Sequence, residues 1–389
     1  MTNPANFDVV VTGQNNSFNK FESIFGGAML NATRASNPSS EFVLDGGDLI
    51  IREIFTGREV ARFEGSNLSV DSMGAPMGTV TSVAFFNFVG NTTYTAAWFN
   101  GADIAVLADA SDESFFNTSP SNAPEWFDAL HDGVRWLQTG TDSTDLFWSY
   151  APDDVILARR GNDTVEYAGS ARRIDGGGGN KDTLDFFRYD FGVTVDLVTG
   201  VIIDGASTTV VRNFERIFGS KFDDTLTVGD ESFRQKVLAG EGNDTVTGGD
   251  GVGLFGEDGE DTLTITGDGG LARGGKGRDV IVSEGDNVVR GDGGRDRIEI
   301  KGGNNTIYGG AQKDEFIFDT GVGVAPDVHV IEDYEFGEKV FFRINSGSID
   351  VAQDGNDVRI TANGENGNVV VILRDTPLVP GLDLLFDFL

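Results

Sequence analysis

Five aspartates recur at nearly constant spacing in the second half of the chain, each at the sixth place of a glycine-rich segment. They are Asp244, Asp261, Asp279, Asp296 and Asp314, and successive members are 17 or 18 residues apart. A glycine-rich turn presents main-chain carbonyl oxygens, and aspartate adds a carboxylate on a short stem. Calcium takes six to eight oxygen ligands of these kinds. These residue types therefore favour a hard divalent cation at each turn.

An apolar residue follows two places after each of these aspartates, in phase with them. These eighth-place residues are Val246, Leu263, Ile281, Ile298 and Phe316. Weaker segments lie between the aspartate-bearing ones, and their eighth places are Leu254, Ala272, Val289 and Ile307, with Val252, Gly270, Asn287 and Asn305 at the aspartate place. A short strand with one inward apolar side chain cannot bury a core alone, but stacked strands joined by glycine turns can. The sequence therefore predicts a flattened coil with one aspartate-rich and one aspartate-poor edge.

The pattern G-G-x-G-x-D-x-U-x resembles the calcium-binding repeat of the RTX (repeats-in-toxin, or hemolysin-type) secreted proteins. With less regularity the resemblance also includes Asp163, Asp182 and Asp224, and it covers about residues 141–389. It implies a C-terminal parallel β-roll with capping strands. The β-rich runs separated by glycine turns in residues 1–140 predict a small N-terminal β-rich, sandwich-like module, so the expected fold class is all-β. The same resemblance implies that each ion sits between successive turns on one edge.

The resemblance also assigns ligands within each turn. The first-place glycines Gly256, Gly274 and Gly291 would contribute carbonyl oxygens beside the aspartate carboxylates. Five aspartate-bearing turns leave four sites between them, so we expect about four or more calcium ions. The aspartate-poor edge should bind calcium weakly or not at all.

The chain divides by composition into three expected domains. Residues 1–140 read as a β-rich module with a short helix near 124–138, where Trp126, Leu130, Val134 and Leu137 would share one face. Residues 141–320 read as the roll, irregular over 141–237 and regular over 238–320. Residues 321–389 read as a cap, and the terminal LDLLFDFL resembles a type I secretion signal.

Charge and composition narrow the partners. The formal net charge is -33, which disfavours nucleic acid and anionic membrane surfaces. Cysteine is absent, so disulfides and thiolate metal sites are excluded. We expect no membrane span and no signal peptide of the general secretory type. The expectation is a secreted protein, extracellular or associated with the cell surface, that the type I secretion machinery exports.

Motifs of the enzymes that carry such repeats are missing. The only histidines are His131 and His329, so there is no H-E-x-x-H zinc motif, and no G-x-S-x-G elbow occurs. The sequence therefore favours a non-enzymatic surface, matrix or adhesion role, with cell-surface or matrix polysaccharide as an expected ligand of the N-terminal module. The alternative is a small secreted carbohydrate-active enzyme, of the polysaccharide lyase or epimerase type, that uses the roll for folding and export.

Overall fold

The computed structural model describes an all-β protein. It covers residues 9–12, 40–45, 48–53, 59–70, 76–86, 93–103, 136–140, 142–149, 154–169, 171–205, 207–229, 235–319, 326–343, 347–364 and 367–378. All regular elements within these segments are β-strands. The described residues contain no helix that is long and apolar enough to cross a bilayer. The chain forms two compact units, one of Met1–Leu184 with Gly205–Phe214 and one of Asp185–Asp204 with Glu215–Leu389.

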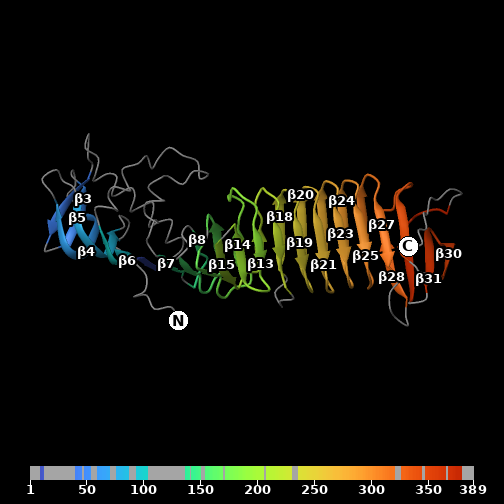
Figure 1. Cartoon of the computed structure of the whole chain (residues 1–389), viewed down its shortest axis with the longest axis horizontal. Helices are drawn as coiled ribbons and strands as arrows, with labels where there is room; N and C mark the ends of the chain where they lie inside the picture. Colours follow the sequence, from blue (N-terminus) through green and yellow to red (C-terminus); the bar gives the residue numbers. More distant parts are fainter. Residues whose placement is uncertain are drawn as a thin grey trace. The chain divides into compact units, whose positions relative to one another are not determined.

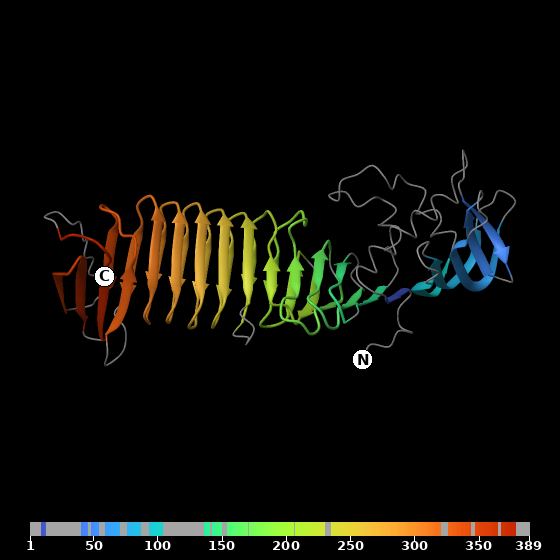
Figure 2. The ribbon, with the colours of Figure 1, turned by 180° about the vertical axis from the view of Figure 1, so that it is seen from behind.

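The second unit is a parallel β-solenoid whose strands alternate between two sheets (Figures 1 and 2). The first sheet runs through β13 (Thr194–Asp196), β17 (Thr225–Thr227), β19 (Thr245–Gly248), β21 (Thr262–Ile265), β23 (Val280–Ser283), β25 (Arg297–Ile300), β27 (Glu315–Asp319) and β29 (Lys339–Arg343). The second runs through β16 (Arg216–Phe218), β18 (Lys236–Glu241), β20 (Gly253–Asp258), β22 (Leu271–Lys276), β24 (Val288–Gly293), β26 (Thr306–Ala311) and β28 (Asp327–Ile331). All of these pairings are parallel. The predicted parallel β-roll is confirmed.

Two columns of apolar side chains fill the space between these sheets. Side chains alternate faces along a strand, so residues two places apart in a strand share its inner face. One column comprises Val246, Leu263, Ile281, Ile298, Phe316 and Val340, and the other comprises Val237, Leu254, Ala272, Val289, Ile307 and Ile331, all 0% exposed. The eighth-place residues identified from the sequence are thus central to the core, to which Ile265, Ile300 and Phe318 also contribute.

The corners at the aspartate-rich edge depend on backbone with positive φ. At the second place of the turn, Gly240 and Gly275 have φ of 115° and 117°, and Glu257 and Asp292 have φ of 78° and 70°. Left-handed backbone costs a residue with a side chain about 1–2 kcal/mol, so glycine suits these corners best. The two exceptions show that the coil maintains the corner even without glycine.

An antiparallel cap closes the C-terminal end of the second unit. Strand β32 (Gly367–Leu373) pairs in parallel with β28, and β31 (Asp357–Gly364) and β30 (Gly347–Asp354) follow it as antiparallel neighbours. Val358, Ile360 and Val371 are fully buried there. The cap therefore pairs the edge of β28, and β30 becomes the terminal strand of this sheet.

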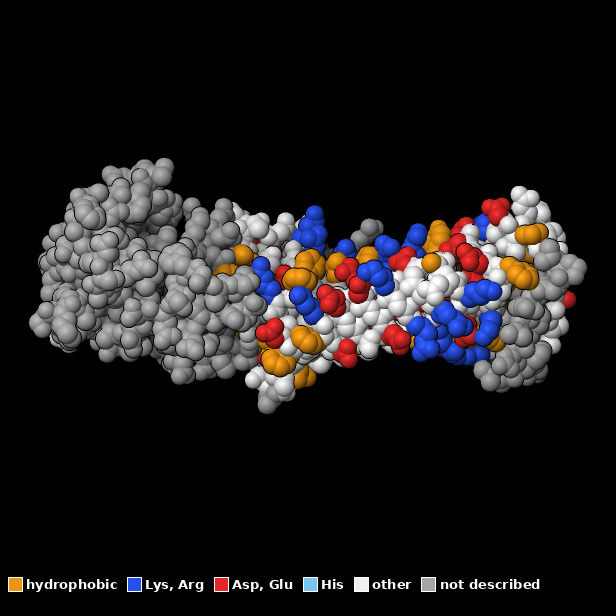
Figure 3. Space-filling model, turned by 90° about the horizontal axis from the view of Figure 1, so that it is seen from above, with side chains coloured by type: hydrophobic (Ala, Val, Ile, Leu, Met, Phe, Trp, Pro, Cys, Tyr) orange, Lys and Arg blue, Asp and Glu red, His pale blue; other side chains and the backbone are white. Residues whose placement is uncertain are grey.

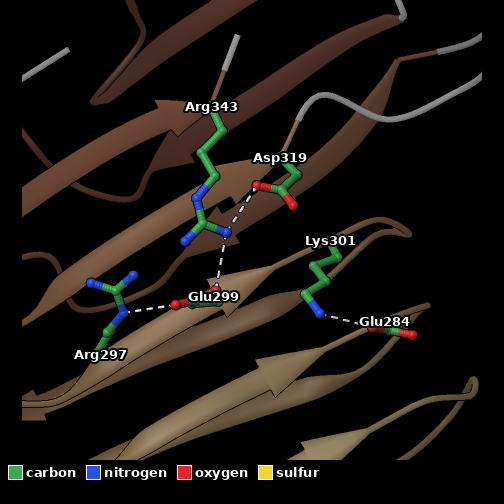
Figure 4. A network of polar contacts seen from close by, with 6 residues as sticks. All are labelled: Glu284, Arg297, Glu299, Lys301, Asp319 and Arg343. Atoms are coloured by element: carbon green, nitrogen blue, oxygen red, sulfur yellow. Dashed lines mark hydrogen bonds and ion pairs between the residues drawn. The ribbon is translucent and has the colours of Figure 1, made fainter. Parts of the chain in front are cut away.

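Positively and negatively charged side chains are mixed on the face of the coil that Figure 3 shows. On the first sheet, Arg343 of β29 contacts Asp319 of the adjacent β27 at 3.3 Å and Glu299 of β25, two strands away, at 3.0 Å (Figure 4). Lys301 also pairs with Glu284 one turn away at 3.0 Å. Partly exposed pairs of this kind each contribute only about 0–1 kcal/mol. The core and the turns, rather than these pairs, determine the fold.

The first unit combines an antiparallel meander with parallel strands. The meander is β2 (Ser40–Asp45), β3 (Asp48–Glu53), β4 (Glu59–Val70), β5 (Pro76–Phe86) and β6 (Thr93–Asp103). Strand β1 (Val9–Thr12) pairs antiparallel with β6 and parallel with β7 (Trp136–Thr139), and β9 (Val155–Leu157), β11 (Arg173–Asp175) and β15 (Ser207–Arg212) continue the parallel part. Strands β8 (Leu146–Ser149) and β10 (Thr164–Tyr167) pair opposite them. The meander and the first coils thus share one sheet.

Two expectations for residues 1–140 differ from this picture. The predicted helix near 124–138 fails at its C-terminal end, because Trp136–Thr139 is strand β7, which has partners on both sides. Residues 124–135 lie outside the described residues. The expected sandwich has two layers, whereas the described strands of the meander belong to a single sheet.

Candidate metal centre

The aspartates of the repeats form a hydrogen-bonded ladder along one edge of the second unit. The N–H of each aspartate donates to Oδ1 of the aspartate one turn later, for instance from Asp261 to Asp279 at 2.9 Å. The ladder joins Asp224, Asp244, Asp261, Asp279, Asp296 and Asp314, with N···O distances of 2.7–2.9 Å. These side chains are at most 2% exposed. One oxygen of each carboxylate is thus committed to holding neighbouring turns in register.

The second carboxylate oxygen has no hydrogen-bond partner in five of these residues. Oδ2 of Asp244, Asp261, Asp279, Asp296 and Asp314 is buried and accepts no hydrogen bond. Buried polar atoms in folded proteins are nearly always paired, because leaving one unpaired costs about 1–3 kcal/mol. A regular row of such oxygens therefore indicates a ligand that the protein atoms alone do not supply.

The first-place glycines border these oxygens. A Cβ placed on Gly256 would clash with Oδ2 of Asp261 and lie 2.5 Å from the carbonyl oxygen of Gly274, one turn later. A Cβ on Gly291 would likewise clash with Oδ2 of Asp296 and lie 2.5 Å from the carbonyl oxygen of Gly309. Gly274 is in the same position beside Asp279. The structure therefore brings the three predicted glycines together with their aspartates, and gathers oxygens from two turns around one place.

The electrostatics of the row favour a cation. Burial raises the pKa of Asp244, Asp261 and Asp296 to about 7, and that of Asp279 to about 6. A hydrogen bond from a neighbouring main-chain N–H opposes each shift, and nearby carboxylates add to it. A buried carboxylate without a counter-charge is driven toward its neutral form. A divalent cation would supply the missing positive charge and keep these groups ionised.

Asp224 occupies the ladder but differs in its hydrogen bonding. Its Oδ1 accepts the Val193 N–H at 2.7 Å and the Ser220 hydroxyl at 3.0 Å, and its Oδ2 accepts the Ser220 N–H at 2.7 Å. Main-chain N–H groups thus already saturate much of this carboxylate. Its role as a ligand stays a prediction, and Asp244 begins the run of unpaired oxygens.

The first unit carries its own piece of the ladder. The N–H of Asp163 donates to Oδ1 of Asp182 at 2.7 Å, and both side chains are 0% exposed. Burial raises the pKa of Asp163 to about 7, and its Oδ2 accepts no hydrogen bond. The two upstream aspartates predicted from the sequence therefore have the same local geometry as the regular repeats.

Sequence reasoning missed Asp145, which precedes these two residues. Its N–H donates to Oδ1 of Asp163 at 2.7 Å, and its side chain is 1% exposed. The segment Gly140–Phe147 has glycine at the first place, aspartate at the sixth and a buried phenylalanine at the eighth. The spacing of these three residues could have identified Asp145 from the sequence. The segment was overlooked because it has no glycine beyond the first place.

The opposite edge of the second unit has different chemistry. Val252, Gly270, Asn287 and Asn305 occupy the aspartate place there, and Oδ1 of Asn287 accepts the Gly270 N–H at 2.7 Å. Three aspartates of this edge, Asp250, Asp268 and Asp286, are exposed instead, and they accept main-chain N–H groups one turn later at 2.6–2.8 Å. In the described part of this edge no aspartate oxygen is both buried and unpaired.

His329 ends the row of asparagines on that edge. It is 0% exposed, its ring lies 5.1 Å from that of Phe318, and its Nδ1 is 3.4 Å from Nδ2 of Asn305. Burial lowers its pKa to about 4. His329 is therefore a neutral core residue near neutral pH.

The donor set fits calcium better than a transition metal. Within the described residues no three or more His, Cys, Asp or Glu side chains gather as a metal cluster. Each turn instead offers a single carboxylate oxygen beside carbonyl oxygens, a set that suits hard cations with many oxygen ligands. Asp244, Asp261, Asp279, Asp296 and Asp314, with the carbonyls beside their glycines, would hold such ions.

Comparisons with known proteins give a limited result. No protein-family model matches the chain, and no curated protein matches it. Among solved structures, the extracellular lipase LipA from Serratia marcescens matches with 15% identity and a TM-score of 0.16. The match covers 63% of this chain and 38% of the lipase chain, so this chain spans well under half of that protein.

Proposed function

We propose that this protein binds a row of calcium ions along its aspartate-rich edge and needs them to fold. The observation that carries the proposal is the run of buried, unpaired Oδ2 atoms from Asp244 to Asp314, spaced one per turn. Without a cation, these carboxylates repel one another and must take up protons to remain buried. With calcium they become ligands, and each ion ties two neighbouring turns together.

Calcium binding of this kind can control folding through the number of sites. Extracellular calcium modules have Kd values of about 10⁻⁴–10⁻³ M. At a calcium concentration of about ten times Kd, each site adds roughly 1.4 kcal/mol to the free energy of unfolding. Four such sites add about 6 kcal/mol, which is comparable to the stability of a whole domain.

Direct calcium counting and circular dichroism test this proposal on the full chain. The expected result is about four or more bound ions by elemental analysis of dialysed protein, and loss of the β spectrum when a chelator removes them. Magnesium should not restore the spectrum, because it demands compact octahedral geometry and gives up its water reluctantly. An unchanged β spectrum in chelator, with no bound calcium, would contradict the proposal.

The biological setting follows from the same switch. In cytosol, where calcium is scarce, the roll would be unfolded and able to pass a type I exporter, and it would fold outside the cell. We extend the proposal to a non-enzymatic secreted role at the cell surface or in the matrix, with the N-terminal meander as the specific part. Binding and turnover assays on surface polysaccharides test this extension, since binding without turnover supports it and turnover favours the carbohydrate-active alternative.

A further inference from the structure

A second kind of acidic site lies where the coil meets its closing strand. Glu338 immediately precedes β29, as Asp314 immediately precedes β27, and these strands pair in parallel with Glu315 opposite Lys339. The Lys339 N–H also donates to the carbonyl oxygen of Asp314 at 3.0 Å, as Glu315 does to Asp296 one turn earlier. Glu338 therefore occupies the aspartate place of the final turn.

The carboxylates of Asp314 and Glu338 face each other in the interior. Both side chains are 1% exposed, and both carboxylates border the first-place glycine of the last repeat, Gly309. Oδ2 of Asp314 and Oε1 of Glu338 accept no hydrogen bond from a donor group of the described chain. A Cβ on Gly309 would lie 2.6 Å from the first of these atoms and 3.2 Å from the second. Two buried oxygens from different carboxylates thus border one glycine.

The surrounding turn holds these groups in place. Oε2 of Glu338 accepts the Glu335 N–H at 2.8 Å, so its second oxygen is committed, as Oδ1 is in the ladder. Asp333 accepts the N–H groups of Gly309 and Gly310 at 2.9 and 3.0 Å, which fixes the start of the last turn. Two ionised carboxylates cannot be this close and buried without a proton or a cation between them.

We infer that Asp314 and Glu338 together form a two-carboxylate site at the end of the row for one hard divalent cation, calcium above all, that binds more tightly than the one-carboxylate sites of the ladder. The inference rests on the proposed function, because it requires calcium to reach this edge. Affinity for calcium rises with the number of charged ligands. We expect this site to bind about tenfold more tightly than a ladder site, and to fasten β29 to the last turn. Glutamate stands at the aspartate place of this turn, which is why Glu338 was not among the ligands expected from the sequence.

Calcium titration of the full chain by calorimetry tests the inference with Glu338→Gln. Glutamine keeps the length and can keep the hydrogen bond from Glu335, and its amide can donate to Asp314, so it imitates the protonated pair. The wild type should show a tight first phase of about one ion, and the variant should lose that phase and one ion. Glu284→Gln, at a half-exposed glutamate that pairs with Lys301 in the turn of the opposite edge, is the control and should change neither.

The outcomes separate this inference from the proposed function. If the wild type binds calcium and Glu338→Gln keeps both the ion count and the tight phase, the pair holds only a proton and the inference is overturned. If the wild type binds no calcium, the proposed function fails with it. Should Glu338→Gln not fold, hydrogen exchange of the wild type decides. Protection of segments 309–314 and 334–338 should need about tenfold less calcium than protection of 240–261, and equal midpoints would overturn the inference.

Discussion

At the scale of single residues, burial of the aspartates distinguishes the two edges of the coil. Asp279 and Asp286 both accept a main-chain N–H from an adjacent turn, at 2.9 and 2.6 Å. Asp279 is 0% exposed with an unpaired Oδ2, whereas Asp286 lies on the solvent side of the other edge. Asp286 also accepts a hydrogen bond from Nδ2 of Asn304 at 3.3 Å. The main-chain hydrogen bonds of the two carboxylates are alike, so the main difference between them is the burial of the charge.

The same substitution at the two positions is therefore a matched test. Asparagine keeps the accepting oxygen and removes the charge. We expect Asp279→Asn to lose at least one bound calcium and to raise the calcium concentration at the folding midpoint several-fold. Asp286→Asn should leave the ion count and the midpoint unchanged. Elemental analysis and calcium-dependent circular dichroism measure both quantities, and equal effects of the two variants would reject a one-sided row.

The ladder could be read from the sequence wherever glycine, aspartate and the apolar place keep phase. That was the case from Asp244 to Asp314, since each of these residues acts within one turn and its immediate neighbours. Hydrogen bonds from segments that are distant in the sequence were not predictable. For example, the Val193 N–H, 31 residues before Asp224, donates to Oδ1 of that aspartate. Asp145 and Glu338 were missed because the first lacks the glycines and the second replaces aspartate.

At the scale of the elements, the turns tolerate side chains only where the next coil leaves space. Gly277 and Gly269 both have positive φ, 127° and 73°. A Cβ on Gly277 would clash with the carbonyl oxygen of Gly259 in the preceding turn, whereas a Cβ on Gly269 would meet nothing within 4 Å. The two glycines therefore differ in how closely the neighbouring turn packs against them, and both have a backbone angle that favours glycine.

Alanine at each of these glycines tests how closely the turns stack. Gly269→Ala should lower the free energy of unfolding in calcium by about 1 kcal/mol, the cost of left-handed backbone. Gly277→Ala should lower the free energy of unfolding by about 1–3 kcal/mol more than Gly269→Ala does, because the turns must also separate. Denaturant unfolding in saturating calcium measures both changes. Equal losses would mean that the carbonyls do not approach the turn as closely as described.

Short strands explain why element boundaries near residue 136 were difficult to predict. The apolar residues Trp126, Leu130, Val134 and Leu137 fit a helical period, yet strand β7 begins at Trp136. Periodicity alone cannot separate a short buried strand from the end of a helix. Here pairing with β1 and β9 determines the outcome, and both partners are remote from the local pattern.

At the scale of the whole molecule, the buried carboxylates link stability to pH in opposite directions with and without calcium. Burial raises the pKa of Asp163, Asp244, Asp261 and Asp296 to about 7, from an ordinary value of 3.8. Without calcium, the folded state binds more protons than the unfolded state between these values. The stability that protonation gives is then complete below pH 4 and is lost as the pH rises through about 7. In calcium, protons compete with the ion, so calcium affinity falls as the pH drops below about 7.

Thermal unfolding across pH 5 to 8 separates these two linkages. In chelator, we expect the melting temperature of any folded coil to rise as the pH falls from 8 to 5, because protons neutralise the row. At a calcium concentration near the folding midpoint, the fraction folded should instead fall from pH 8 to pH 6. Asp279→Asn should flatten both slopes, since it removes one titrating group, whereas Asp286→Asn should keep them. Parallel pH profiles in chelator and in calcium would contradict the account, because they would mean that the ion and the protons do not compete for the same buried oxygens.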